Sequence, residues 1–303
     1  MTFNLSILNW NIQSSSSVTG DKFQDPEFTN LFNKHAILCL QETRQQIKYP
    51  GYRSLNKTRK EEKHGGVCTL IRNDISKGIT LQKCAIPDII VCKISKTFFG
   101  LTDDIFIINC YIRPANSSSK TIDHVGTDQL KDLTEQINDL TNKGRVVVCG
   151  DFNSRIGTDA DYIKNTNVEG TTFVPLPDDI IMEHQIPRNT EDVKVNGYRR
   201  PFLDMTIHNG LTILNGRTTG DALGKFTCIR PSGSSVVDYF IISPELMTKV
   251  MHMVVQPFTI YSDHKPIVLT FSLISKPASL KPVKELSKEY KAAPARFRIK
   301  CST

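Results

Sequence analysis

A short apolar run that ends in an acid and an amide constrains this chain most. Val146–Cys149 is typical of a buried strand, and Gly150, Asp151, Phe152 and Asn153 follow it directly. Side chains alternate along a strand, so Asp151 and Asn153 face the same way if the extended backbone continues through both. An acid and an amide at the mouth of a sheet suit an attacking water, a metal ion or a phosphate oxygen. For these residues alone, an Asx-rich turn after a strand is the safer interpretation.

Three other segments end in the same way. Residues 6–11 end at Asn11, residues 36–42 end at Glu42, and residues 259–264 end in the adjacent pair Asp263 and His264. Apolar runs of this length between polar residues are typical of strands buried on both faces. Four such endings in order along one chain are hard to attribute to chance, so the functional interpretation gains weight.

The remaining pattern predicts a layered α/β protein. Strands are expected at residues 4–11, 37–41, 66–72, 89–94, 105–112, 145–151, 236–242 and 267–273, and helices at 24–33, 127–143 and 201–209. In the second helix, apolar residues recur every three or four positions and form one stripe, and Gly144 follows where a C′ glycine would end it. Residues 157–200 have weak periodicity, and we expect them to form a long surface excursion.

Length and charge favour one domain with a basic tail. Strand runs are scattered evenly over the first 275 of the 303 residues, and we expect residues 1–275 to fold as one unit. The segment 276–303 holds eight basic and two acidic residues, so it carries most of the net charge of +7. A solvated linker and a segment that adds salt-sensitive affinity for nucleic acid both remain open.

The expected compartment is intracellular. There is no apolar stretch of about 18 residues or more, so no membrane-spanning helix is expected. The N-terminus enters the first strand at once and leaves no room for a signal peptide. Several of the eight cysteines lie within strand runs (Cys39, Cys92, Cys110, Cys149), which fits buried reduced thiols.

Six motifs, taken in order, resemble those of the endonuclease/exonuclease/phosphatase superfamily. They are Asn11, Glu42, Tyr111, Gly150–Asn153, Val237–Phe240 and Ser262–His264, and the match runs from about residue 5 to about residue 273. Residues 214–221 and 224–239 are similar, more narrowly, to the endonuclease domain of LINE-type (non-LTR) retrotransposons. The resemblance implies a four-layer α/β sandwich, in which two packed mixed β-sheets are flanked by helices.

The resemblance also implies an activity. It is that of a Mg²⁺-dependent DNA endonuclease that nicks one strand and leaves a 3′-hydroxyl, as in target-primed reverse transcription. The implied partners are double-stranded DNA and a reverse transcriptase domain, to which no part of this chain is similar, and the implied location is nuclear. Residues 1–275 are then the catalytic domain.

Glu42 is the first choice of metal ligand, with Asn11 beside it and Asp263 as a further candidate. Hard oxygen ligands suit Mg²⁺, for which Mn²⁺ can substitute, and Mg²⁺ takes only one or two protein carboxylates. Some relatives, notably abasic-site endonucleases, have an acid two residues after the motif asparagine, where this chain has Gln13. A neutral amide ligates weakly, so lower metal affinity is expected.

The other motif residues suit phosphate chemistry. The resemblance makes Asp238 the partner of His264, and a carboxylate on one ring nitrogen fixes the tautomer and stabilises imidazolium. Asp151 is expected to orient or deprotonate the attacking water, while Asn153 and Tyr111 hydrogen-bond the phosphate. Whether Asp151 or His264 is the general base stays open. Asn9 is interpreted as a residue for packing and hydrogen bonding.

Two alternatives remain. Abasic-site repair enzymes carry a bulky aromatic just before their Asp-Tyr-Phe-like motif, where this chain has Gly233, Ser234 and Ser235, in a hairpin expected from residues 225–229 and 235–242. Abasic-site repair is therefore the second interpretation. The third is a catalytically silent DNA-binding module of the same fold. The intact set of motif residues opposes it, and Gln13 is its only support.

The tail gives a first prediction. Deleting residues 276–303 is expected to weaken DNA binding most at low salt, because fewer phosphates are neutralised, without changing the position of the cut. Titration of DNA at several salt concentrations with both proteins measures this. Equal affinities at low salt would make the segment a linker only.

Overall fold

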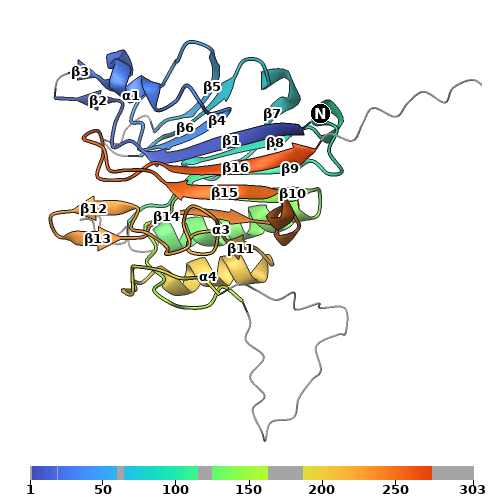
Figure 1. Cartoon of the computed structure of the whole chain (residues 1–303). Helices are drawn as coiled ribbons and strands as arrows, with labels where there is room; N and C mark the ends of the chain where they lie inside the picture. Colours follow the sequence, from blue (N-terminus) through green and yellow to red (C-terminus); the bar gives the residue numbers. More distant parts are fainter. Residues whose placement is uncertain (1, 19, 60–64, 115–124, 163–186, 275–303) are drawn as a thin grey trace, which may run out of the picture.

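The computed structural model describes residues 2–18, 20–59, 65–114, 125–162 and 187–274. The basic tail and most of the expected surface excursion at 157–200 lie outside these residues. Two six-stranded sheets form the body of the protein (Figure 1). In spatial order, the first sheet contains β15 (Val250–Val255), β16 (Ile267–Ile274), β1 (Thr2–Asn11), β4 (Ile37–Gln41), β6 (Val67–Arg72) and β5 (Tyr52–Lys57). The second contains β11 (Thr212–Ile213), β14 (Asp238–Ile242), β10 (Arg145–Asp151), β9 (Ile105–Tyr111), β8 (Ile89–Ile94) and β7 (Ile79–Gln82).

Both sheets are mixed. In the first, β1 and β4 are parallel, and in the second, β9 and β10 are parallel, while the other pairs are antiparallel. Parallel neighbours end at the same edge of a sheet. The carboxyl ends of these four strands therefore meet at one end of the molecule. Two small hairpins project there, β2 (Ser16–Ser17) with β3 (Gly20–Asp21) and β12 (Cys228–Arg230) with β13 (Gly233–Ser235), on the left of Figure 1.

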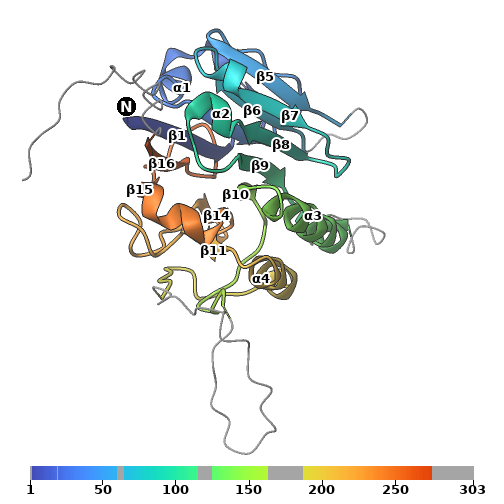
Figure 2. The same ribbon diagram turned by 90° about the vertical axis from the view of Figure 1, so that its right-hand side faces the viewer.

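Helices cover the outer faces and complete the four expected layers. The covering helices are α1 (Pro26–Asn30) on the first sheet and α3 (Val125–Thr141) and α4 (Arg199–His208) on the second, whereas α2 (Lys96–Phe99) packs Phe99 against the core between the sheets. The short 3-10 turns are η1 (Lys22–Gln24), η2 (Ser76–Gly78) and η3 (Pro244–Lys249). The predicted stripe of α3 is buried against the second sheet together with α4. Phe28 and Phe32 cover the first sheet. Figure 2 shows α1 and α3 on opposite sides of the two sheets.

The strand pattern explains why the sheets pack. Alternate residues of each strand enter the space between the sheets, such as Leu5 and Ile7 on β1 and Val147 and Cys149 on β10. The intervening residues, such as Trp10, face the outer layers. All seven cysteines among the described residues are free thiols, and the four predicted to be buried are buried. No helix of the described part is long and apolar enough to cross a membrane.

Three predicted elements are present with bounds that differ from those expected. The helix expected at 24–33 is only Pro26–Asn30, because Asp25 caps it and Pro26 occupies its first turn. The helix expected at 127–143 ends at Thr141, and Gly144 is needed for another reason, since a Cβ there would lie 2.3 Å from the Asp104 carbonyl oxygen.

The third concerns the hairpin, which is shorter than expected. Strand β13 ends at Ser235 and β14 begins only at Asp238. The intervening backbone leaves the ladder because the amides of Val237 and Asp238 donate to the Thr227 hydroxyl, each at 3.1 Å. The amide of Val236 donates to Asp192 instead.

Gly150, before the motif acid, is expected to be irreplaceable. A Cβ at this position would lie 1.9 Å from the carbonyl oxygen of Cys110 on the neighbouring strand, and φ is +156°. We expect Gly150→Ala to lower the free energy of unfolding by about 2–3 kcal/mol, since the backbones must separate. Urea unfolding measures it, with Gly197→Ala as the control because no atom lies within 4 Å of its Cβ. An equal, small effect of both changes would contradict the assignment.

Candidate active site

The site lies where the carboxyl ends of strands from both sheets converge. Asn11 ends β1, Glu42 follows β4, Tyr111 ends β9 and Asp151 ends β10. Asp238 is opposite Asp151 in the ladder because β14 runs antiparallel to β10 and starts where β10 ends. Residues from five separate sequence motifs are therefore adjacent for a topological reason.

The Asn11 amide joins carboxylates of the two sheets. Its Nδ2 donates to Glu42 Oε1 and to Asp151 Oδ2, each at 2.9 Å, and its Oδ1 accepts from the backbone amide of Gln13 at 3.0 Å. Asn11 and Asp151 are buried, and the Glu42 side chain is 13% exposed. The backbone at Glu42 is left-handed, with φ of 51°. Asn11, Glu42 and Asp151 are therefore adjacent, as expected. A strained backbone turn places Glu42 among them.

Asp151 and Asn153 meet through a turn and not through an extended backbone. Asp151 Oδ1 accepts from the backbone amide of Asn153 at 2.9 Å, an Asx turn, and Asn153 has φ of 49°. Asn153 Nδ2 donates to the Ile112 carbonyl at 2.8 Å and lies 3.4 Å from Asp151 Oδ2. The simpler interpretation of this sequence is therefore correct about the backbone, while both side chains still belong to the site.

His264 and Asp238 form the expected pair. His264 Nδ1 lies 2.9 Å and 3.1 Å from the two Asp238 oxygens, and both residues are 1% exposed. On the other side of the ring, Nε2 lies 3.9 Å from Asp151 Oδ2. This Nε2 is buried and has no hydrogen-bond partner among the residues that the structure describes. A buried N–H without a protein partner, beside a carboxylate, suits an incoming oxygen atom.

The charges of this group are strongly coupled. Burial alone lowers the pKa of His264, but Asp238 and Asp151 outweigh it and raise the pKa well above its ordinary value. Burial raises the pKa of Asp151 to about 7, and the His264 cation limits that rise. His264 is therefore held as imidazolium. Asp151 has the basicity that proton transfer near neutral pH requires.

Tyr111 lies among the acids. It is 5% exposed, and burial together with Glu42 and Asp151 raises the pKa of its hydroxyl. The phenol is therefore a neutral hydrogen-bond donor. The contributions of Glu42 and Asp151 to this shift show that their carboxylates lie near the hydroxyl.

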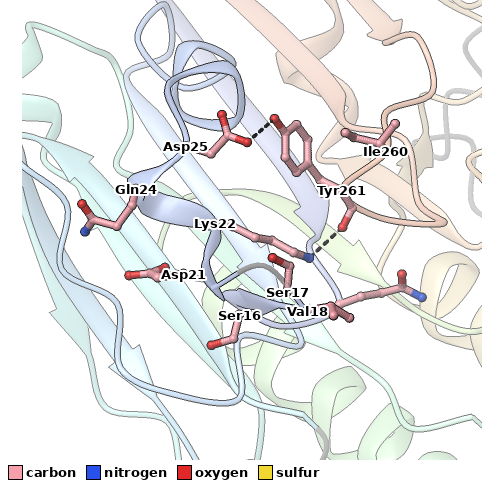
Figure 3. A pocket seen from close by; sticks show the side chains of 10 residues that line it. Ser16, Ser17, Val18, Asp21, Lys22, Gln24, Asp25, Ile260 and Tyr261 are labelled. Atoms are coloured by element: carbon pink, nitrogen blue, oxygen red, sulfur yellow. Dashed lines mark hydrogen bonds between the residues drawn. The ribbon is translucent and has the colours of Figure 1, made fainter.

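Hydrogen bonds from side chains to backbone carbonyls fix the loop that carries His264. The Trp10 indole N–H donates to the His264 carbonyl at 2.8 Å, and Ser262 Oγ donates to the Asn11 carbonyl at 2.7 Å. Lys22 Nζ donates to the carbonyls of Ile12 and Tyr261, each at 2.7 Å. Figure 3 shows the Lys22 bond within a cavity of about 820 Å³ beside the site. The sequence alone gave no signal for Lys22.

Asp263 lies at the rim with Gln13. Gln13 Nε2 donates to Asp263 Oδ2 at 3.0 Å, and the Asp263 backbone amide donates to Gln13 Oε1 at 3.0 Å. Arg230 Nε lies 3.3 Å from the same Asp263 oxygen. The Asp263 side chain is 42% exposed. Gln13 therefore ties the end of β1 to the segment before His264, and Asp263 faces this pair and the hairpin arginine.

Two groups of residues are candidates for a divalent cation. Asp151, Asp238 and His264 offer ligand atoms within 4.8 Å of one another. However, Nδ1 of His264 already faces both oxygens of Asp238, and an imidazolium ring does not ligate a metal. Glu42 offers a hard carboxylate oxygen that is less enclosed, beside the amide of Asn11. The carboxylates of Glu42 and Asp151, both near Tyr111, fit a cation at Glu42.

A cavity of about 410 Å³ adjoins the catalytic edge at Asn153. The β12–β13 hairpin forms one wall with Gly233, Ser234 and Ser235, which present no large side chain. The lining has three basic side chains, Lys194, Arg155, which pairs with Asp192, and Arg230, which pairs with Asp263. It also contains Pro114, Asn196, Gly197, Ser232 and Val237. Trp10, the single tryptophan, is fully buried and lies elsewhere.

The pKa of Asp151 generates a prediction for the metal-free protein. Because folding raises this pKa from about 4 to about 7, the ionised form is destabilised in the folded state. The free energy of unfolding is therefore not reduced by this group at low pH, and it falls as the pH rises from about 4 to about 7. The measurement is urea unfolding in EDTA near pH 5 and near pH 8. Relative to the wild type, the free energy of unfolding of Asp151→Asn should be higher near pH 8 than near pH 5. A pH-independent difference would contradict the shift.

Comparison with known proteins places this geometry in a family. Among solved structures, the AP endonuclease LMAP from Leishmania major has a TM-score of 0.64 at 12% identity, covering 89% of this chain and 88% of that one. The 3′ phosphatase NExo from Neisseria, bound to a product DNA hairpin, has a TM-score of 0.58 at 18% identity, covering 88% and 99%. The catalytic domain of Xenopus laevis APE2 has a TM-score of 0.59 at 15% identity, covering 89% and 93%.

At these identities the solved structures show the fold alone. Among curated proteins, no sequence relative matches the chain. The model of the endonuclease/exonuclease/phosphatase family matches residues 8–264, which run from β1 to His264. The chain therefore belongs to the endonuclease/exonuclease/phosphatase family.

Proposed function

We propose that this protein is a metal-dependent DNA endonuclease that nicks one strand and leaves a 3′-hydroxyl. The observation that carries the proposal is the partnerless Nε2 of buried His264, 3.9 Å from Asp151 and close to a cavity lined by basic residues. Hydrolysis of a phosphodiester needs a cation beside the phosphate oxygens and a base for the attacking water. The His264 imidazolium supplies the cation and Asp151 supplies the base.

The roles follow from the charges. Asp151 takes a proton from the water that attacks phosphorus, and the P–O3′ bond breaks, so the phosphate stays on the 5′ end. The leaving 3′ oxygen takes a proton from solvent and becomes the 3′-hydroxyl. His264, held as imidazolium by Asp238, donates from Nε2 to a phosphate oxygen. Tyr111 and Asn153 donate to the same phosphate. In this proposal the general base is Asp151.

Glu42, with Asn11 beside it, would hold Mg²⁺ or Mn²⁺. A bound divalent cation supplies charge neutralisation at the phosphate and the leaving oxygen. Asp263 is a weaker candidate in this proposal, because its carboxylate already faces Gln13 and Arg230. With an amide at position 13, few protein carboxylates are available to the cation, which favours modest affinity.

The cavity beside Asn153 supports an undamaged DNA strand as substrate. Lys194 and the exposed Arg230 provide positive charge for backbone phosphates, and the Gly233–Ser235 wall leaves room for a whole nucleotide. Abasic-site cleavage remains the second candidate. It is favoured by the likeness of the fold to the Leishmania major AP endonuclease. The lack of a bulky side chain in that wall opposes it.

The finer biological role rests on sequence. Residues 214–221 and 224–239 are similar to the endonuclease domain of LINE-type retrotransposons, and this supports nicking for target-primed reverse transcription. In that role the chain works in the nucleus with a reverse transcriptase domain. A catalytically silent DNA-binding module is opposed by the assembled site. His264 is paired with Asp238, and its Nε2 lies 3.9 Å from the buried Asp151 carboxylate.

The test is cleavage of supercoiled plasmid with Mg²⁺ and with EDTA, followed by polymerase extension from the nick. Glu42→Ala and His264→Ala are each expected to lower nicking by at least about a hundredfold, since each removes charge stabilisation of the transition state. Glu135→Ala and His208→Ala, both on the exposed surface, are the matched controls.

Metal-dependent open circles with extendable ends support the proposal. Cleavage confined to an abasic oligonucleotide would replace it by the repair activity. Intact DNA of both kinds would favour a phosphatase or a silent module, and wild-type turnover by either alanine variant would show that the site is elsewhere.

A further inference from the structure

The space between the two sheets changes character close to the site. Over most of its length it is filled by aliphatic side chains and thiols, such as Ile7, Ile107 and Val147. One step before the catalytic edge it contains three amides, Asn9 on β1, Gln41 on β4 and Asn109 on β9, each 0% exposed. These three residues are called the amide layer here.

The amide layer links the sheets by hydrogen bonds. Gln41 Nε2, from the first sheet, donates to Asn9 Oδ1 and to Asn109 Oδ1, each at 2.7 Å. Asn109 Nδ2, from the second sheet, donates to the Cys68 carbonyl at 3.0 Å and lies 3.2 Å from the Thr69 hydroxyl. The direct bonds in this layer therefore set the separation of β9 from β4 and β6.

Filling a protein core with these three amides is energetically unfavourable. Nδ2 of Asn9 and Oε1 of Gln41 have no hydrogen-bond partner within the part of the chain that the structure describes. A buried polar group without a partner destabilises the folded state, and apolar groups of the same shape are often neutral or better. Stability alone therefore does not account for amides at these positions.

The position of the amide layer relative to the site gives another reason. Asn9 and Asn109 lie two residues before Asn11 and Tyr111 on the same faces of their strands, a distance of about 6.6 Å along each strand. Gln41 directly precedes Glu42, whose left-handed φ of 51° must be held by its surroundings. The amide layer is thus the last fixed layer beneath the catalytic edge.

We propose that the amide layer is a positioning device for Glu42. By fixing Gln41 against Asn9 and Asn109, it holds the turn at Glu42 and sets the spacing of that carboxylate from Tyr111 and Asp151, which belong to the other sheet. This inference rests on the proposed function, in which Glu42 holds the divalent cation. Gln41, Asn9 and Asn109 are positioning residues and touch neither the cation nor the DNA.

The experiment compares Gln41→Met with the wild type in three measurements. Methionine keeps the length and shape of glutamine but removes its hydrogen bonds. In EDTA, the urea midpoint is expected to fall, because the buried Oδ1 atoms of Asn9 and Asn109 lose their donor. The Kd for Mg²⁺ from calorimetry is expected to rise about tenfold, and kcat for plasmid nicking to fall about a hundredfold with KM nearly unchanged, since displacement of about 1 Å is enough.

Ile107→Val is the matched control, because it lies on the same face of β9 two residues before Asn109. It should lower the urea midpoint while leaving the Kd for Mg²⁺ and kcat near wild type. Asn109→Val repeats the test from the second sheet, and it replaces Gln41→Met if that variant does not fold.

The outcomes separate the inference from the proposed function. A wild-type protein that neither binds Mg²⁺ nor nicks DNA overturns the function and this inference with it. An active wild type, with a variant whose midpoint falls while Kd and kcat stay unchanged, shows a purely structural layer and overturns the inference alone. A loss of metal affinity and kcat in Gln41→Met supports it when Ile107→Val, with its own lowered midpoint, keeps both near wild type.

Discussion

The site depends on one amide, Nδ2 of Asn11, which donates to carboxylates that belong to different sheets. Glu42 and Asp151 would repel one another if each stood alone at this buried edge, and a shared donor offsets part of that repulsion. The bond is possible only because the carboxyl ends of β1, β4, β9 and β10 meet where the two sheets are packed together. The amide layer beneath makes the meeting point rigid.

The same packing produces the electrostatics. Asp151 and Asp238 face His264 from β10 and β14, so the imidazole is held as a cation although burial opposes its charge. Burial keeps Asp151 basic enough to accept a proton near neutral pH. The negative charge that remains lies toward Glu42 and Tyr111. One end of the sandwich therefore offers a proton acceptor, a phosphate-binding cation and a site that favours a divalent ion.

The sequence predicts the centre of the fold better than its margins. All eight strands expected from buried apolar runs are present, whereas β5, β7, β11 and β15, the edge strands of the two large sheets, were missed. An edge strand pairs on one side only, so its residues are less buried, as in β5, where every residue is half-buried. Its hydrophobic pattern is correspondingly weak.

The site residues follow the same rule. Motif order brings Asn11, Glu42, Asp151, Asp238 and His264 together as expected, because each ends or begins a central strand or precedes one. The bonds that hold them, such as that of Lys22 to a carbonyl 239 residues away, depend on tertiary packing and leave no local pattern.

The most direct test of this account is a crystal structure with Mn²⁺, located by its anomalous scattering. The account predicts one peak at the carboxylate of Glu42, next to Asn11, with His264 still paired to Asp238. A peak enclosed by Asp151, Asp238 and His264 would contradict it, because that cation would displace the imidazolium on which the proposed chemistry depends.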